Sequence, residues 1–183
     1  MNAKLANPKG LGYGAIFISG WMFSLYNTHW YTQMATVNWV TGLILGAVAV
    51  TFAGILSYFR GETYEFTLFS ALGAYFFIFS LDYILFSFMG SSFSANGGWI
   101  EVVWAVLFFY MWLSVFMEKG IFVFLFLLGL WLTFLDFAVG NWIASRVCIY
   151  IGGYIGLATS VLAGWLSAQA LWESTKTVQV EGA

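Results

Sequence analysis

Long apolar runs separated by short polar breaks dominate the pattern of this chain. A helix that crosses the hydrocarbon core of a bilayer needs about 20 mostly apolar residues, with about 17–25 tolerated. Runs of this length predict six spans: Leu11–Asn27, Val37–Phe59, Phe66–Met89, Gly98–Met117, Gly120–Val139 and Val147–Trp172. They are too long and too continuously apolar for barrel strands of about 10 residues. The pattern therefore predicts an all-α membrane protein with six transmembrane helices.

The polar breaks between the runs indicate loops. Residues 60–63 separate the second and third spans, and Glu118–Gly120 form a tight turn between the fourth and fifth. Gly140–Asn141 are predicted to end the fifth helix, because glycine is favoured just after a helix C-terminus. We expect residues 1–173 to form one six-helix domain and residues 174–183 to form a short polar C-terminal tail.

Composition and rare residues exclude several classes of protein. Of 183 residues, 62% are hydrophobic and 8% are charged, whereas soluble domains have about 45–50% and about 25%. Six Lys plus Arg against eight Asp plus Glu form no basic face for nucleic acid. Cys148 alone forms no internal disulfide, and His29 alone gives no imidazole pair for zinc. Without a metal spacing or a nucleophile pair, we expect neither an enzyme nor a cofactor.

The distribution of positive charge predicts the orientation of the chain. With six spans, the two termini, the second-to-third loop and the fourth-to-fifth loop share one side of the membrane. That side carries most of the cations: Lys4, Lys9, Arg60, Lys119 and Lys176. The other side carries only Arg146. Because cytoplasmic loops are enriched in Lys and Arg, we expect both termini in the cytoplasm of a multi-pass protein of the inner or plasma membrane.

Three acids fall inside the predicted spans, where an ionisable group costs about 2.5–3.5 kcal/mol near the centre of a helix. We interpret Glu101 as a residue of an exposed helix N-terminus, where a carboxylate is favoured. Asp136 lies within a turn of the outer interface and fits a capping role as well as a pore role. Asp82 is the deepest of the three, and we favour a functional role for it.

Small residues recur every four positions in two spans, as they do where membrane helices approach closely. The last span has Gly152, Gly156, Ser160 and Gly164, and the second span has Gly42, Gly46 and Gly54. We interpret these stripes as helix packing within one bundle. The alternative, that some of them face a narrow pore or a neighbouring subunit, stays open.

Several short motifs carry a resemblance to a known family. Asn7-Pro8 is followed by Leu11-Gly12, and Gly140-Asn141 recurs near the end of the fifth span. The most specific run extends from Phe52-Ala53-Gly54 through Gly61, Thr63, Thr67 and Phe69 to Gly73. In these residues the chain resembles the acetate uptake transporter family, which includes bacterial succinate–acetate permeases. The resemblance implies a homo-hexamer with a narrow pathway through each protomer, and proton-linked passage of acetate and related small carboxylates.

The resemblance also assigns roles to single residues. The constriction of the family is built from two aromatic side chains and a leucine, and the matching positions here are Ile16, Leu72 and Leu130. The leucine is kept, while both aromatics are replaced by aliphatic side chains. Ala163 matches a small position near the pathway that influences which carboxylate passes. Departures from the family pattern include Val50, Ser57, Glu62, Glu65, Asp82 and Asp136.

Polar groups on both sides of the neck are needed because it is costly for a carboxylate to shed its water. The predicted groups are Asn7, Asn27, Thr67 and Asn141. A protonated pair of acids, Asp82 and Asp136, is predicted to pass a proton together with the anion. The alternative function is a channel for a neutral or cationic small solute such as ammonia, which the acidic outer half of the predicted bundle favours.

Overall fold

A computed structural model describes residues 6–30, 35–89, 97–115 and 120–181. These segments fold into helices, in agreement with the predicted fold class. In chain order the elements are α1 (Lys9–Asn27), α2 (Ala35–Thr41), the π-helix η2 (Gly42–Ala49), α3 (Val50–Phe59), α4 (Thr63–Met89), α5 (Gly97–Val115), α6 (Ile121–Trp142) and α7 (Arg146–Glu181).

The predicted spans correspond closely to these helices. Among the described residues, five helical segments are long and apolar enough to cross a membrane: Val37–Phe59, Thr63–Leu85, Gly98–Val115, Ile121–Trp142 and Arg146–Lys176. The first predicted span corresponds to α1, whose 19 residues fall within the tolerated length of about 17–25. It is less apolar than the others because glycine and serine recur along it.

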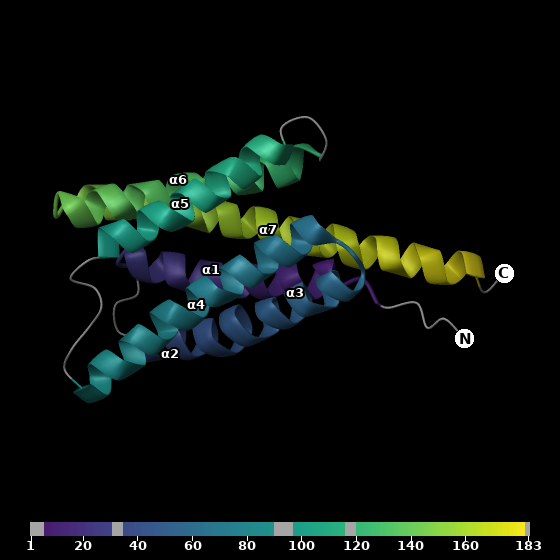
Figure 1. Ribbon diagram of the computed structural model, residues 1–183, viewed down its shortest axis with the longest axis horizontal. Coiled ribbons are helices and arrows are strands. Elements are labelled where there is room, and N and C mark those ends of the chain that lie inside the picture. The colour runs from purple at the N-terminus through teal and green to yellow at the C-terminus, as the bar shows by residue number, and fades with distance from the viewer. Residues whose placement is uncertain (1–5, 31–34, 90–96, 116–119, 182–183) are drawn as a thin grey trace.

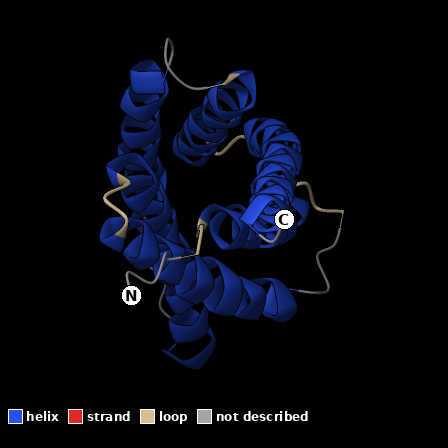
Figure 2. Cartoon of the chain, turned by 90° about the vertical axis from the view of Figure 1, so that its right-hand side faces the viewer, coloured by secondary structure: helices blue, strands red, loops and turns tan. Residues whose placement is uncertain are grey.

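The bundle consists of two groups of helices with α1 between them (Figure 1). On one side α5 packs on α6 and α6 packs on α7, while on the other α4 packs on η2 and α3. Helix α1 contacts α7 of the first group and η2 and α3 of the second. Figure 2 looks along the bundle and shows the helices nearly end-on. The small residues of α1 thus face neighbouring helices, which lets their backbones approach closely.

The starts of α1, α4 and α6, the end of α3 and the C-terminal half of α7 meet at one end of the bundle, which we name the Lys9 end. Lys9 at the start of α1 forms an ion pair with Glu65 in the first turn of α4. In the C-terminal half of α7, the hydroxyl of Ser167 donates to the carbonyl of Gly10. Gly120, just before α6, lines the same hollow as Lys9. This arrangement requires each long element to run the length of the bundle, as six crossings demand.

Two predicted helix ends differ from the structure. Helix α6 passes Gly140 and ends at Trp142, because Gly140 serves close packing: a Cβ there would lie 2.7 Å from the Ile149 side chain of α7. The prediction that Gly140–Asn141 end the helix is therefore wrong. Helix α7 continues through Ser174 to Glu181, so the polar segment from residue 174 prolongs the last helix.

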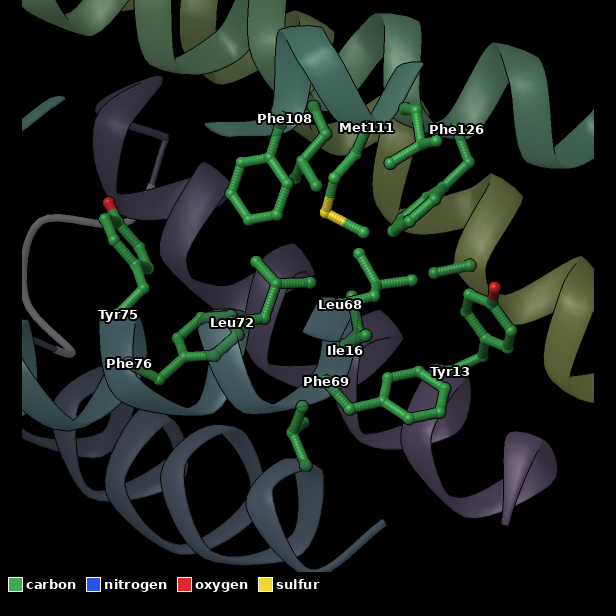
Figure 3. Packing of buried hydrophobic residues seen from close by; sticks show 14 of the residues in the cluster. Tyr13, Ile16, Leu68, Phe69, Leu72, Tyr75, Phe76, Phe108, Met111 and Phe126 are labelled. Carbon is green, nitrogen blue, oxygen red and sulfur yellow. The ribbon is translucent and has the colours of Figure 1, made fainter. Parts of the chain in front are cut away.

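The interior is apolar and rich in aromatic rings, and the exterior is apolar as well. Leu68, Phe69, Phe108 and Phe126 are fully buried (Figure 3). Large apolar side chains are also exposed on the outward faces of the helices, among them Phe59, Val103, Tyr110 and Ile143. An apolar surface of this extent on a soluble monomer would be an interaction site, and in a bilayer it faces lipid.

Candidate functional site: a neck between two hollows

Three apolar side chains from three helices meet at one level of the bundle. Ile16 of α1, Leu72 of α4 and Leu130 of α6 are buried and line the same hollow of about 40 Å³. Their helices all begin at the Lys9 end, and these are the lining residues of their helices closest to it. We name the three the neck. The structure brings together the positions that the resemblance assigned to the constriction, and their role stays a prediction.

The hollow above the neck carries hydroxyl groups, and we name it the hydroxyl chamber. Its polar lining residues come from four helices: Ser24, Tyr75, Thr133, Thr159 and Ser160. A water molecule needs about 10–15 Å³ by this measure, so the chamber has room for about three waters. The chamber therefore holds only a few water molecules, and like ligand sites in general it is lined mainly by apolar side chains with a few polar groups.

The hydroxyls of the chamber can accept hydrogen bonds from a solute more readily than they can donate. Thr133 donates to the carbonyl of Gly129, Thr159 to that of Ile155 and Ser160 to that of Gly156, each at 2.8 Å. A hydroxyl has one hydrogen and two acceptor lone pairs. Because these hydrogens are engaged within their own helices, the chamber offers mainly lone pairs to a solute.

A second hollow lies at the Lys9 end, and we name it the charged vestibule. It has a volume of about 290 Å³, and its lining includes Lys9, Tyr13, Glu65, Gln169 and Glu173. The Lys9 ammonium lies 3.0 Å from the Glu65 carboxylate, whose side chain is only 7% exposed. The positive charge that an entering anion meets is therefore already shared with an internal acid.

A layer of aromatic rings separates the vestibule from the neck. The Tyr13 ring contacts the edges of Phe69 and Phe126, with centroids 5.2 and 5.7 Å apart. Tyr13 lines the vestibule and Ile16 lines the chamber, and the two lie about 4.5 Å apart along the axis of α1. The close-up shows Ile16, Leu68 and Leu72 in the middle of the buried cluster, with Tyr13 to one side (Figure 3). The aromatic layer thus lies one turn closer to the Lys9 end than the aliphatic neck.

The predicted polar groups beside the pathway lie elsewhere. The Asn7 side chain accepts a hydrogen bond from the backbone N–H of Lys9, and the Asn27 amide donates to the carbonyl of Phe23. The Thr67 hydroxyl donates to the carbonyl of Thr63, and Asn141 is exposed. The residues Asn7, Asn27, Thr67 and Asn141 line neither the chamber nor the vestibule. Their part in the pathway stays a prediction.

Three other predicted residues also lie outside both linings. Ala163 is fully buried in α7 and belongs to the hydrophobic core. Asp82 of α4 is half-buried, and so is Asp136 of α6, whose Cβ lies beside Gly152 of α7. The structure does not bring the two acids together with the neck, and their role as proton sites stays a prediction.

The structure overturns the interpretation of Glu101. Instead of lying at an exposed helix N-terminus, its side chain is 3% exposed and buried one turn inside α5. The Tyr75 hydroxyl, 2% exposed, donates to Oε1 of Glu101 at 3.5 Å. Oε2 of Glu101 has no hydrogen-bond partner within the described part of the chain. Because Gly98 packs against Trp142 of α6, the face of the first turn that carries Gly98 and Glu101 is covered, while Trp99 on the other face is exposed.

Sequence reasoning missed the residues that give the two hollows their polarity. Thr133, Thr159 and Ser160 are hydroxyl residues of spans, and nothing in their spacing separates them from hydroxyls that face lipid or other helices. Lys9 and Glu65 lie far apart in the chain, and only the parallel arrangement of α1 and α4 brings them together. The sequence does not say how each helix is rotated about its own axis, and this rotation decides which residues line the hollows.

The fold and the two hollows define a helical, multi-pass membrane protein with a narrow internal neck. Residues 1–181 match the GPR1/FUN34/yaaH family. The chain belongs to this family, which confirms the resemblance found in its motifs.

Two relatives indicate the range of transport proteins that the chain resembles. The succinate–acetate/proton symporter SatP of Escherichia coli is 27% identical over 169 residues, covering 91% of this chain and 88% of the relative. The ammonia transport outward protein 3 of Saccharomyces cerevisiae is 28% identical over 172 residues, covering 90% of this chain and 62% of the relative. Both relatives are named as transport proteins.

A solved structure shares the fold. The structure of the bacterial acetate channel SatP superimposes with a TM-score of 0.88 at 22% sequence identity, covering 94% of this chain and 95% of the other. The arrangement of helices is therefore shared with that channel.

Proposed function

We propose that this protein conducts acetate and related small monocarboxylates through the membrane, along the wall formed by α1. Two hollows lie along α1, the charged vestibule and the hydroxyl chamber, separated by the Tyr13 layer and the neck. This juxtaposition is the observation that carries the proposal. The similarity to a succinate–acetate/proton symporter and to an acetate channel supports the choice of solute.

The neck restricts passage by excluding water and by size. Ile16, Leu72 and Leu130 offer a carboxylate no hydrogen bond, and shedding water from an ion is far more costly than shedding it from a neutral group. The acceptor-rich chamber adds to this preference, because an undissociated acid carries a donor and a carboxylate does not. The solute therefore crosses the neck as the neutral acid, with one proton for each carboxylate.

The second candidate is ammonia, which a specific feature of the chamber favours. Ammonia is a hydrogen-bond donor, so it fits the lone pairs of Thr133, Thr159 and Ser160. The similarity to an ammonia transport outward protein supports this candidate. Acetate has the stronger support, because both a relative and a solved structure are named for it.

Uptake into proteoliposomes distinguishes the two candidates. We expect labelled acetate to enter faster than into empty liposomes, and faster still with an inward proton gradient. Lactate, succinate and ammonium measured in parallel define the solute. Uptake of ammonium without uptake of any carboxylate would replace the first candidate by the second.

The two half-buried acids give a separate prediction on proton linkage. If Asp82 and Asp136 pass the proton, Asp82→Asn abolishes the pH dependence of uptake and leaves exchange of labelled for unlabelled acetate intact, because Asn keeps the shape of Asp but does not titrate. The measurement is uptake across a series of pH values. An unchanged pH profile would end the idea of a proton site at Asp82.

The orientation, membrane and assembly are part of the proposal. The excess of Lys and Arg on one side supports cytoplasmic termini in the inner or plasma membrane. We propose a homo-hexamer, as the family resemblance implies, in which the apolar outward face of α5 is available for contact. Cysteine labelling from each side of the membrane tests the orientation, and native mass spectrometry of the detergent-solubilised protein tests the hexamer.

A further inference from the structure

Glu101 and Tyr75 form a buried polar pair behind the hydroxyl chamber. The Tyr75 ring lines the chamber and lies between Phe134 and Phe79, with ring centroids 4.6 and 4.4 Å away. Its hydroxyl donates to Oε1 of Glu101 of α5 at 3.5 Å. Tyr75 is thus the side chain that connects the chamber to a carboxyl group otherwise enclosed by apolar residues.

No positive charge compensates Glu101, which forms no ion pair among the described residues. On α6, which packs along α5, the titratable group is Asp136, and it turns its Cβ toward α7. On α4, Tyr75 faces Glu101, and Asp82 lies two turns further along. On α5 itself, Tyr110 is exposed. The other titratable groups of α4 make their contacts elsewhere: Tyr64, Glu65 and Tyr83.

A carboxylate in this environment would be a buried, uncompensated charge, which is among the most costly features of a protein interior. A protonated carboxyl group avoids that charge, with its hydrogen on Oε2, the oxygen that does not accept from Tyr75. Buried acids inside membranes are retained mainly where they serve transport. The position behind the chamber therefore calls for a role in the movement of the solute.

We propose that Glu101 is a proton-binding group of the transport route and acts on the hydroxyl chamber through Tyr75. This inference rests on the proposed function and names the source of the proton. When a carboxylate reaches the chamber, the Tyr75 hydroxyl turns from Oε1 of Glu101 to the solute, and the carboxyl group turns its Oε2–H to the phenol oxygen. The two protons then shift together, so that Glu101 loses one proton and the solute gains one. The solute leaves as the neutral acid, and Glu101 regains a proton through the same Tyr75 hydroxyl from a hydronium ion that enters the chamber from the side from which the solute came. One proton moves with each carboxylate.

Four variants in proteoliposomes test the proposal. Glu101→Gln keeps the shape and an acceptor for Tyr75 but does not release a proton, so acceleration of acetate uptake by a proton gradient is expected to vanish while acetate exchange at equal pH continues. Tyr75→Phe keeps the ring and is expected to behave alike. Glu101→Asp keeps a titrating carboxyl and is expected to retain the acceleration. Glu62→Gln, an acid paired with Arg60 outside the spans, is the matched control with wild-type behaviour.

The outcomes separate this inference from the proposed function. Acceleration that survives in Glu101→Gln, or that is lost equally in Glu101→Asp, overturns the role of Glu101. If the wild-type protein moves no acetate, the proposed function fails. The proton site is then tested by a spectroscopic measurement that needs no solute. Infrared difference spectra between acidic and alkaline buffer are expected to contain a carboxylic-acid carbonyl band that Glu101→Gln removes. A band unchanged by that substitution overturns the proton site.

Discussion

Replacing Leu130 with alanine is expected to raise the initial rate of acetate uptake about tenfold, which corresponds to a barrier about 1.4 kcal/mol lower. Leu130 closes the neck together with Ile16 and Leu72, and all three are almost completely buried. Alanine removes most of the side chain, so water enters the neck and the solute sheds less of its hydration. The measurement is uptake of labelled acetate by proteoliposomes containing equal amounts of protein.

Leu127→Ala is the matched control for the neck. Leu127 lies one turn away on α6 and is fully buried, but it lines neither hollow. Both substitutions are expected to destabilise the protein by about 2–5 kcal/mol, because each leaves a cavity in the core. Thermal unfolding in detergent should therefore change in both variants, while uptake rises only in Leu130→Ala. Equal rates in the two variants would contradict a barrier at the neck.

Removing the ammonium group of Lys9 is expected to lower both the stability of the protein and its uptake of acetate. Lys9→Ala deprives the buried Glu65 carboxylate of an ion-pair partner at 3.0 Å. Breaking a buried ion pair from one side costs about 3–5 kcal/mol, and because Lys9 is one-third exposed we expect about 2 kcal/mol. The vestibule also loses the cation that attracts an anion arriving from the Lys9 end, so the effect on uptake is expected in proteoliposomes whose protein has that end facing outward. Thermal unfolding and uptake at low acetate concentration measure the two effects.

The double substitution Lys9→Ala with Glu65→Gln separates the two effects. Neutralising both partners removes the buried charge, so stability is expected to recover toward that of the wild type, as a double-mutant cycle would report. Uptake stays low because the cation is still absent. Glu65→Gln alone is expected to raise uptake at low acetate concentration, since it leaves the Lys9 charge available. Uptake that recovers together with stability would contradict a role for Lys9 in attracting the anion.

Hydropathy predicted the fold well because a membrane span depends on the length of an apolar run, which is a local property. The boundaries of α3 and α6 illustrate the limit. Arg60 and Gly61 end α3 as expected, with Gly61 in the left-handed region at φ 72°. Gly140, in contrast, lies inside α6, because a glycine needed for close packing carries the same signal as one that ends a helix. Local pattern does not distinguish these two uses.

The candidate site was only partly predictable for a related reason. Ile16, Leu72 and Leu130 were found through the family resemblance, which carries information on three-dimensional position. The asparagines were chosen for their chemistry alone, and the structure places Asn7 and Asn27 in hydrogen bonds to nearby backbone. The sequence predicts an exposed Glu101 because it lies near a helix start, and tertiary packing of α5 on α6 buries it. Which face of a helix meets which neighbour depends on contacts distant in the chain.

The π-helix η2 widens the turns of the second span, so that its buried face and its exposed face both run parallel to the helix axis. Gly42, Gly46, Val50 and Gly54 are all buried, while Val40, Ile44, Val48 and Phe52 are all exposed. In an α-helix of 3.6 residues per turn, residues spaced four apart shift gradually around the helix. The i→i+5 hydrogen bonds of η2 give wider turns, which compensate for this shift. The span can therefore lie flat along α4 without coiling about it. Deleting one residue from η2 would rotate the rest of the span about its axis. Phe52 and Phe59 would then turn away from the lipid and clash with the helices that the buried face now contacts.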